Sequence, residues 1–261
     1  DTTFRDRLEL TVDGRELHLI ATPGGETFDS MVVWLPESRT LFSGNLTGPL
    51  FGHVPNLVTI RGDRYRDALT YIDSLQLLVD LRPDTLLTGH FDPIVGADRV
   101  VEEAVAMQDA MRFVHDRTVD GMNAGADVHT LMRDVQLPAH LDVGEGYGKT
   151  SWNVRAIWEN YAGWFHHRST TELYGVPPSS IAPGVVAAAG ADALAAAAQA
   201  RLAAGEPVAA LHLTDLVLAV ESGHAGARLV ASEATRALLD DTTNFWESAW
   251  LRRALHRLER P

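Results

Sequence analysis

The sequence predicts an α/β layer followed by an all-α domain, and three patterns carry this prediction. Short runs over residues 7–21 alternate apolar and polar side chains and a continuous apolar run follows at 31–35, a pattern typical of strands joined by tight turns. Residues 64–81 have the spacing of an amphipathic helix, and one more strand is expected at 85–88; a helix between strands is typical of the outer layer of an αβ/βα sandwich. From Ala97 onward the periodic segments have helical spacing. We therefore expect an α/β domain over residues 1–98.

Turn signals delimit the strands of this first domain. Residues 7–12 and 16–21 flank Asp13-Gly14, which is a hairpin signal. The apolar run at 31–35 predicts a buried strand, and a two-residue turn leads from it into a strand at 40–42. Together these segments predict a β-meander.

The second domain is expected over residues 99–261, with glycine and proline between its helices. Pro177, Pro178 and Pro183 indicate a linker over about residues 168–184. The helices are expected at 100–119, 127–135, 151–165, 191–204, 207–220, 225–239 and 245–258.

Composition limits the classes of function. The net charge of −13 argues against a nucleic-acid partner, because binding to phosphates needs clustered lysine and arginine. A small anionic substrate is still compatible, since one arginine can hold it. The longest apolar run, near residues 185–200, is mostly alanine and glycine, and we expect no membrane span. No signal peptide opens the sequence and it has no cysteine, which fits a cytoplasmic protein and restricts metal ligands to histidine and oxygen donors.

Three short turns at the ends of strand-like runs carry possible metal ligands. They are Glu26 in a glycine-rich turn, Asn45 after 40–42, and His90 after 85–88. A carboxylate, an amide oxygen and an imidazole suit a borderline cation such as zinc. Asn45 has an alternative reading, as a residue tolerated in a turn that needs left-handed geometry.

At these turns the chain resembles the C-terminal half of the metallo-β-lactamase superfamily. Thr22-Pro23-Gly24-Gly25-Glu26 followed by a strand, Ser43-Gly44-Asn45-Leu46 and Thr88-Gly89-His90 are similar to its ligand turns. Residues 56–62, 146–154 and the helical tail resemble the alkyl sulfatase branch, in which a carboxylate at the position of Glu26 is typical. The resemblance implies a hydrolase with zinc, two ions in the complete protein, and a homodimer formed through the helical domain.

An anion site is expected beside the metal. Arg61 follows the long loop after Asn45, and a fixed guanidinium there suits sulfate, phosphate or carboxylate. Asn56 offers an amide and Tyr147 a phenol, and in the resembling sulfatases the matching positions line the sulfate site. His53 lies in the same loop and is a further candidate.

Asp29 is expected to orient the Glu26 turn through backbone hydrogen bonds rather than to bind metal.

The resemblance also has gaps. The superfamily's main metal motif, His-x-His-x-Asp-His, is absent from these residues, and Asn45 stands where alkyl sulfatases carry a bridging carboxylate. We expect the missing motif upstream of Asp1, and the 261 residues alone to be nearly inactive. Two alternatives remain: an inactive dimerisation or scaffold module, and a metallohydrolase of a different ester, thioester or lactam.

Overall fold

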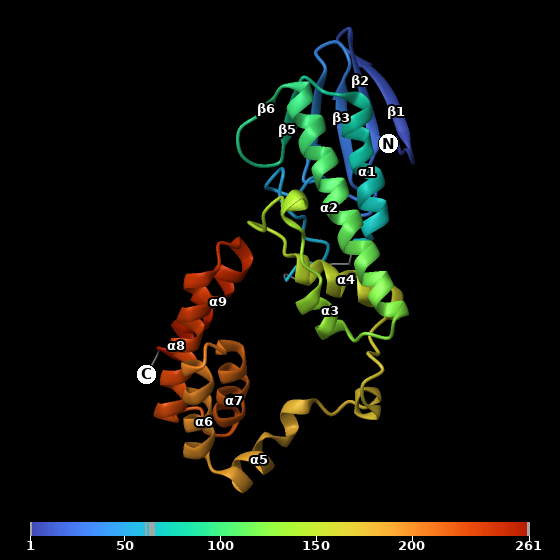
Figure 1. Ribbon diagram of the computed structural model, residues 1–261. Coiled ribbons are helices and arrows are strands. Elements are labelled where there is room, and N and C mark those ends of the chain that lie inside the picture. Colours follow the sequence, from blue (N-terminus) through green and yellow to red (C-terminus); the bar gives the residue numbers. More distant parts are fainter. Residues whose placement is uncertain (1, 61, 63–65, 260–261) are drawn as a thin grey trace. The chain divides into compact units, whose positions relative to one another are not determined.

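A computed structural model describes residues 2–60, 62 and 66–259 (Figure 1). The chain divides into two compact units, Asp1–Arg168 and Ser169–Pro261. Unit 1 contains two hydrophobic cores, and helix α2 (Ala97–Asn123) joins them into one unit because each core takes part of its buried face. Val100 and Ala104 pack under the sheet, whereas Met107 and Met111 pack against later helices. The packing break therefore lies at 168/169, and the domain boundary expected at 98/99 stays a prediction.

One mixed sheet forms the first part of unit 1. Its strands follow sequence order, and neighbouring pairs are antiparallel except β4 and β5, which are parallel. The expected strands are present, and a short sixth strand was not expected. The strands are β1 (Arg7–Val12), β2 (Arg15–Ala21), β3 (Met31–Leu35), β4 (Thr40–Gly44), β5 (Thr85–Thr88) and β6 (Ile94–Val95).

Helices α1 (Ala68–Leu81) and α2 lie across one face of the sheet, in front of the strands in Figure 1. The side chains that meet there are almost fully buried, with Val32 and Leu41 at 0% exposure. Within the described residues α1 begins at Ala68 rather than at 64, because Asp67 caps it by accepting a 2.8 Å hydrogen bond from the Thr70 amide.

The opposite face, here called the open face, also carries apolar side chains but leaves them partly or largely exposed to solvent. The strand register places Leu10, Leu17, Leu19, Val33 and Phe42 on this side of neighbouring strands. Leu10 is 38% and Phe42 43% exposed. Both faces are thus apolar, as in the buried layer of a sandwich, and one of them is left open in this unit.

The rest of unit 1 is helical, with two helices beyond the sheet: α3 (Val128–Asp134) and α4 (Thr150–Ala162). They form a second core with α1 and α2, which includes Tyr71, Met111 and Ile157. The long loop between β4 and α1 and the glycine-rich loop before α4 lie on this core, through Val54, Leu57 and Val143.

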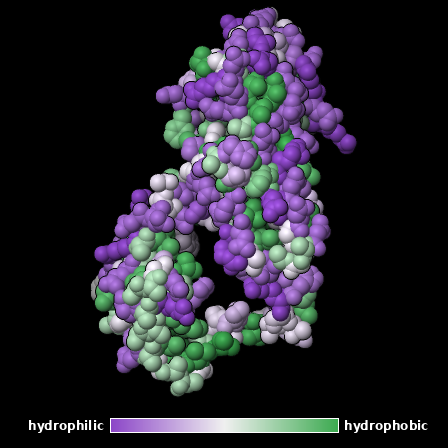
Figure 2. Space-filling model, viewed as in Figure 1, coloured by the Kyte–Doolittle hydropathy of each residue, from purple (hydrophilic) through white to green (hydrophobic). Residues whose placement is uncertain are grey.

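Unit 2 consists of short helices whose contacts are made mainly by small residues. Ala198, Ala210 and Ala234 are fully buried where helices cross. The alanine-rich segment shows as pale green at the lower left of Figure 2. The expected linker contains two 3-10 turns and the start of α5, a helix that was not expected. The helices are α5 (Ala182–Ala189), α6 (Ala191–Ala203), α7 (Pro207–Val220), α8 (Ala225–Asp241) and α9 (Phe245–Leu258).

No single helix among the described residues is both long and apolar enough to cross a membrane. The pair Pro178–Ala189 and Ala191–Ala203 reaches that length and composition only jointly, across a bend of 104°.

Candidate metal and anion site

The parallel pairing of β4 and β5 brings two of the predicted turns together. Gly44 is paired with Thr88, and the Gly89 amide donates a 2.8 Å hydrogen bond to the Gly44 carbonyl. Because both strands end at the same edge, Asn45 and His90 leave the sheet side by side.

The turn that carries Glu26 is fixed against helix α1. The Thr22 amide bonds to the Ser30 carbonyl at 2.8 Å, which closes the turn, and the Gly24 amide bonds to Ser74 Oγ at 3.1 Å. A Cβ on Gly24 would lie 2.2 Å from the Thr70 carbonyl oxygen. Only glycine allows this close approach, so the glycine in the turn serves packing.

Asn45 joins the Glu26 turn to the His90 turn. Its Nδ2 donates a 2.8 Å hydrogen bond to Glu26 Oε2. Its Oδ1 is buried and accepts no hydrogen bond from any described residue, and it lies 2.3 Å from the position that a Cβ on Gly89 would occupy. A buried acceptor without a donor is costly, and the Glu26 carboxylate beside it adds the kind of oxygen donor that a cation would satisfy. Glu26 and Asn45 therefore have the chemistry of a cation site, and His90 follows Gly89, whose Cβ position lies against Asn45 Oδ1.

His90 lies at the surface, beside a cavity. The Thr88 hydroxyl donates to the His90 carbonyl, which fixes the backbone of the turn. The His90 side chain is exposed and lines a cavity of about 260 Å³ together with Leu50, Phe51 and Phe91.

The loop that carries Asn56 is held against the glycine-rich loop that carries Tyr147. The Val54 amide bonds to the Gly144 carbonyl at 3.0 Å, and the Gly148 amide bonds to the Val54 carbonyl at 3.1 Å. His53 Nδ1 accepts from the Gly146 amide at 3.3 Å. The structure thus brings together the loops of His53, Asn56 and Tyr147, whereas Arg61 lies outside the described residues.

Asn56 is fully buried, and neither its Nδ2 nor its Oδ1 has a hydrogen-bond partner among the residues that the structure describes. Leaving both atoms unpaired costs free energy, and a bound ligand that paired with them would remove this cost. Asn153, a buried residue that sequence reasoning did not select, holds this loop in place. Its Oδ1 accepts from the Leu57 amide at 3.0 Å and its Nδ2 donates to the Pro55 carbonyl at 2.8 Å.

Leu50 links the two groups of residues. It lines the cavity beside His90, and its Cδ2 lies 2.8 Å from the position that a Cβ on Gly146 would occupy. The strand-end ligands and the Tyr147 loop therefore flank the same short segment of chain.

Asp29 is exposed and accepts a 2.6 Å hydrogen bond from Thr27 Oγ1. This bond, and a second one from its own backbone amide, lower the pKa of the Asp29 carboxyl. The main hydrogen-bond donor to the Asp29 carboxyl is thus a side-chain hydroxyl, and the backbone amide contributes less.

Tyr71 is a further buried polar group near this site. Its hydroxyl has no hydrogen-bond partner in the described part of the chain, and burial raises the pKa of the phenol while the nearby Arg66 partly opposes the rise. The sequence analysis did not single out Tyr71, because its burial depends on packing between distant segments.

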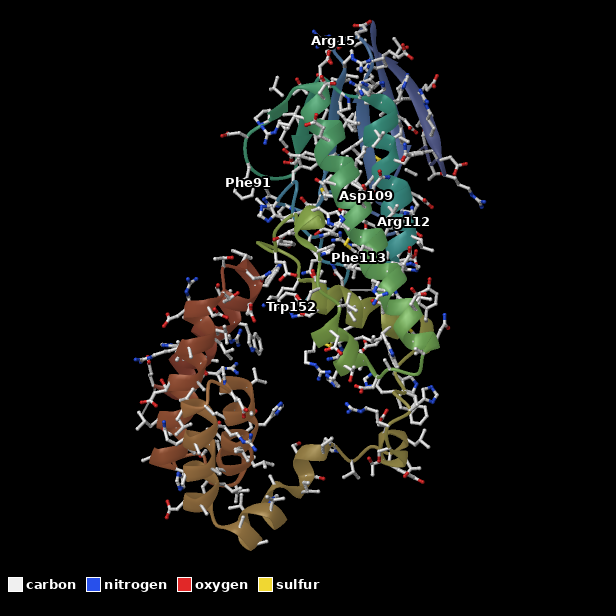
Figure 3. All side chains as sticks on the ribbon, viewed as in Figure 1. Arg15, Phe91, Asp109, Arg112, Phe113 and Trp152 are labelled. Atoms are coloured by element: carbon white, nitrogen blue, oxygen red, sulfur yellow. The ribbon has the colours of Figure 1, made fainter. Side chains whose placement is uncertain are left out.

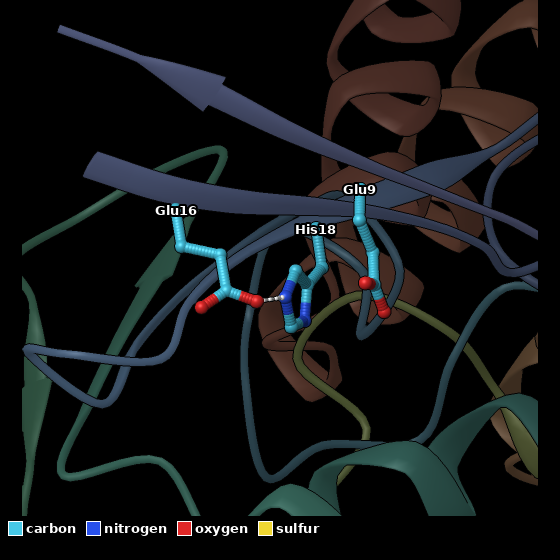
Figure 4. A group of neighbouring side chains, drawn as sticks. All are labelled: Glu9, Glu16 and His18. Atoms are coloured by element: carbon cyan, nitrogen blue, oxygen red, sulfur yellow. Dashed lines mark hydrogen bonds and ion pairs between the residues drawn. The ribbon is translucent and has the colours of Figure 1, made fainter. Parts of the chain in front are cut away.

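A second group of possible ligands lies on the β1–β2 hairpin, away from these turns (Figure 4). Oxygen or nitrogen atoms of Glu9, Glu16 and His18 come within 4.8 Å of one another. However, His18 Nδ1 contacts the guanidinium of Arg7, which can only donate, and Nε2 contacts Glu16. Both ring nitrogens are therefore engaged within the chain, and the group is a hairpin-stabilising network.

Comparison with known proteins identifies relatives of this chain. A family model described as "Alkyl sulfatase dimerisation" matches residues 128–259. A linear primary-alkylsulfatase of Pseudomonas sp. is 34% identical over 72% of this chain and 36% of its own length. An alkyl/aryl-sulfatase of Saccharomyces cerevisiae is 28% identical over 93% of this chain and 38% of its own length.

The solved structure of a stereoselective inverting sec-alkylsulfatase from Pseudomonas sp. has the same fold. It superposes with a TM-score of 0.88 at 26% identity, over 99% of this chain and 42% of that chain. The chain thus spans about two fifths of the length of these three relatives, between 36% and 42%. The chain belongs to the alkyl sulfatase dimerisation family.

Proposed function

We propose that this chain is part of a metal-dependent hydrolase, and that its substrate is an alkyl sulfate or a related anionic ester. The observation that carries the proposal is Asn45, whose Nδ2 holds the Glu26 carboxylate while its buried Oδ1 stays unpaired beside the His90 turn. The names of the relatives support the substrate class.

Each residue has a distinct role in this proposal. Glu26 and His90 hold a zinc ion, and Asn45 orients the Glu26 carboxylate. When bound, zinc supplies a Lewis acid that lowers the pKa of water toward ~7. Asn56 offers its buried amide to the anionic head group, and Tyr147 offers a phenol on the adjoining loop. Donors held in a dry site stabilise charge on a leaving sulfate better than water does, because they need not reorganise.

The remaining metal ligands are proposed to come from chain beyond these residues. The relatives are more than twice as long, and the open face of the sheet has the apolar character expected of the inner surface of a sandwich. The helical residues 128–259 match the dimerisation model, which supports a homodimer as the working assembly.

Metal binding by the chain itself tests the proposal directly. We expect calorimetric titration with Zn²⁺ to show binding that Glu26→Gln and His90→Ala each weaken at least ~10-fold, the order of effect typical of groups that hold or orient a metal. His224→Ala in unit 2 is the control, since His224 bonds to Asp192 and the Ala227 amide.

Asn45→Asp separates the effects on stability and affinity. It replaces the 2.8 Å amide–carboxylate hydrogen bond with two facing carboxylates, so the metal-free chain should lose stability while Zn²⁺ affinity rises. Unchanged Zn²⁺ affinity in all three variants would show that Glu26, Asn45 and His90 do not form a zinc site.

The specific observation that favours an inactive scaffold is the same hydrogen bond, because Glu26 is already satisfied in part by Asn45. Absence of Zn²⁺ binding together with intact dimerisation would support that alternative. For the complete protein, hydrolysis of a lactam but not of a medium-chain alkyl sulfate would instead indicate a different substrate class.

A further inference from the structure

A histidine and a tyrosine that the roles above do not use meet between helices α2 and α4. His115 lies on α2 and is 8% exposed, whereas Tyr161 lies on α4 and is 54% exposed. His115 Nε2 is 2.8 Å from the Tyr161 hydroxyl oxygen, and the two rings are tilted by 57° with their centroids 5.8 Å apart. A buried imidazole is thus joined to a half-exposed tyrosine.

A carboxylate determines which ring nitrogen of His115 carries the proton. Asp116 Oδ1 lies 2.8 Å from His115 Nδ1. An ionised carboxylate can only accept a hydrogen bond, so Nδ1 carries the proton and donates it to Asp116. In the neutral imidazole Nε2 is then the acceptor, and the Tyr161 hydroxyl donates to it. Carboxylate, imidazole and hydroxyl therefore stand in the order that activates the nucleophile of a hydrolytic triad.

The arginines next to Asp116 on α2 do not neutralise its carboxylate. Arg112, labelled in Figure 3, lies one turn before Asp116, and Arg117 directly follows it. Within the described residues neither arginine forms an ion pair with Asp116, whose charged partner is His115. The carboxylate can therefore orient the imidazole and stabilise the imidazolium that forms when Nε2 takes a proton.

Contact between α2 and α4 is not made by this pair alone. The two helices also share an apolar core that includes Met111, Val114 and Ile157. Tyr174, which is 71% exposed, has by contrast no side-chain hydrogen bond within the described residues. The hydrogen bonds of Tyr161 thus add to packing, and they act on its hydroxyl oxygen.

We propose that Tyr161 is a nucleophile that takes acyl groups from activated esters, with His115 as its general base and Asp116 as the residue that positions the imidazole. The phenol oxygen forms a bond to the acyl carbon while the bond between that carbon and the leaving oxygen breaks. His115 Nε2 takes the hydroxyl proton and passes it to the leaving oxygen. The products are an O-acyl tyrosine and the alcohol or phenol of the donor. None of the residues assigned to the metal and anion sites takes part, so this inference does not rest on the proposed function.

The test is the reaction of the 261-residue chain with p-nitrophenyl acetate, with peptide mass spectrometry to locate the acetyl groups. We expect Tyr161 to be acetylated at least ~10-fold faster than Tyr174, because a positioned general base contributes typically about 10²–10⁴-fold. Exposure alone predicts the reverse order, since Tyr174 is 71% and Tyr161 54% exposed. A rate at Tyr161 no higher than that at Tyr174 would overturn the proposal.

Two substitutions separate the base from the residue that positions it. His115→Gln removes the base but keeps a carbonyl that can accept from the Tyr161 hydroxyl, so acetylation there should fall ~10-fold or more. Asp116→Asn should also lower the rate at Tyr161, because an amide can donate to Nδ1 and favour the other tautomer. Nitrogen-15 NMR of the His115 ring should show the proton on Nδ1 in the wild type and on Nε2 in Asp116→Asn, a change that a packing role would not produce.

Tyr174→Phe is the matched control and should leave the rate at Tyr161 unchanged. Acetylation of Tyr174 in each variant is the internal reference, and it should stay constant in His115→Gln and Asp116→Asn. If His115→Gln does not fold, Asp116→Asn decides alone, because the Asp116 side chain is 59% exposed and its replacement leaves the core intact. An unchanged rate at Tyr161 in the folded variants would overturn the proposal.

Discussion

Leu41 and Phe42 are neighbours on β4, yet their environments are opposite. Leu41 is 0% exposed against the helices, while Phe42 is 43% exposed on the open face. The same comparison holds on β3, where Val32 is 0% and Met31 41% exposed. Both faces are apolar in sequence, so the pattern of residues alone does not say which face a helix covers.

Contacts with the helices on the covered side of the sheet also hold in place the turn that carries Glu26 and the long loop after β4. Gly24 packs on the backbone of α1, and a Cβ on Gly52 would lie 2.8 Å from Glu103 of α2. The geometry of Glu26 and of the long loop therefore depends on covered contacts that are complete within unit 1. Among the described residues the open face makes none of these contacts, so the helix-covered side alone holds both segments in place.

The largest difference in unfolding free energy is expected between truncations of Leu41 and of Phe42. Leu41→Ala leaves a cavity in a close-packed core and should cost roughly 2–5 kcal/mol of unfolding free energy. Phe42→Ala in the same 261-residue chain should cost less than about 1 kcal/mol, because its side chain is already partly hydrated. Urea unfolding of both variants measures the difference. Similar losses for the two would show that the open face is covered in solution.

The next largest effect is expected where the Glu26 turn meets α1. Gly24→Ala forces a methyl group against the Thr70 carbonyl and should destabilise unit 1 by roughly 1–3 kcal/mol, the cost of overpacking. Zn²⁺ binding should weaken with it, because the turn must shift. Thermal unfolding and metal titration together measure the effect.

Gly184→Ala is the matched control, since nothing lies within 4 Å of its added Cβ and it sits inside helix α5. Alanine should there stabilise the helix by about 0.5–1 kcal/mol. Equal effects of the two substitutions would contradict the docking of the turn on α1.

Regular elements were the most predictable part of the fold. The first five strands and most helices follow from apolar spacing, because burial on one face imposes that spacing. Strand β6 has only two residues, too few for a pattern, and α5 lies in a proline-rich stretch that indicated a linker. Helix α2 runs past both expected ends because it serves two cores.

The candidate site was predictable only in outline. The residue types at three strand ends led to Glu26, Asn45 and His90, and the pairing of β4 with β5 explains why the last two converge. The sequence could not show that Asn45 bonds to Glu26, nor that Asn56 is buried without partners, since both depend on contacts between distant segments. Arg61 lies outside the described residues and stays a prediction.

Substitution of Tyr71, which lies on helix α1, should have a smaller effect on stability, and it should raise stability rather than lower it. Its hydroxyl is buried without a partner, so Tyr71→Phe should stabilise the ligand-free chain by on the order of 1 kcal/mol. Tyr161→Phe should not stabilise, because the Tyr161 hydroxyl bonds to His115 Nε2 at 2.8 Å. Chemical unfolding of the two variants decides. A loss of stability in Tyr71→Phe would show that the hydroxyl has a bonding partner in solution.

The smallest effect concerns Asp29, on the exposed side of the Glu26 turn. The Thr27 hydroxyl lowers the pKa of the folded Asp29 carboxyl below its usual 3.8, so the bond contributes stability above that pH. The contribution is lost as pH falls through the folded pKa. Thr27→Val removes the donor, and an NMR titration of the carboxyl carbon should then show the pKa of Asp29 rising toward its usual value. The Zn²⁺ affinity at pH 7 should change little, because the buried contact at Gly24 is what holds this turn in place. A large loss of affinity would show that the bond between Thr27 and Asp29 holds the turn instead.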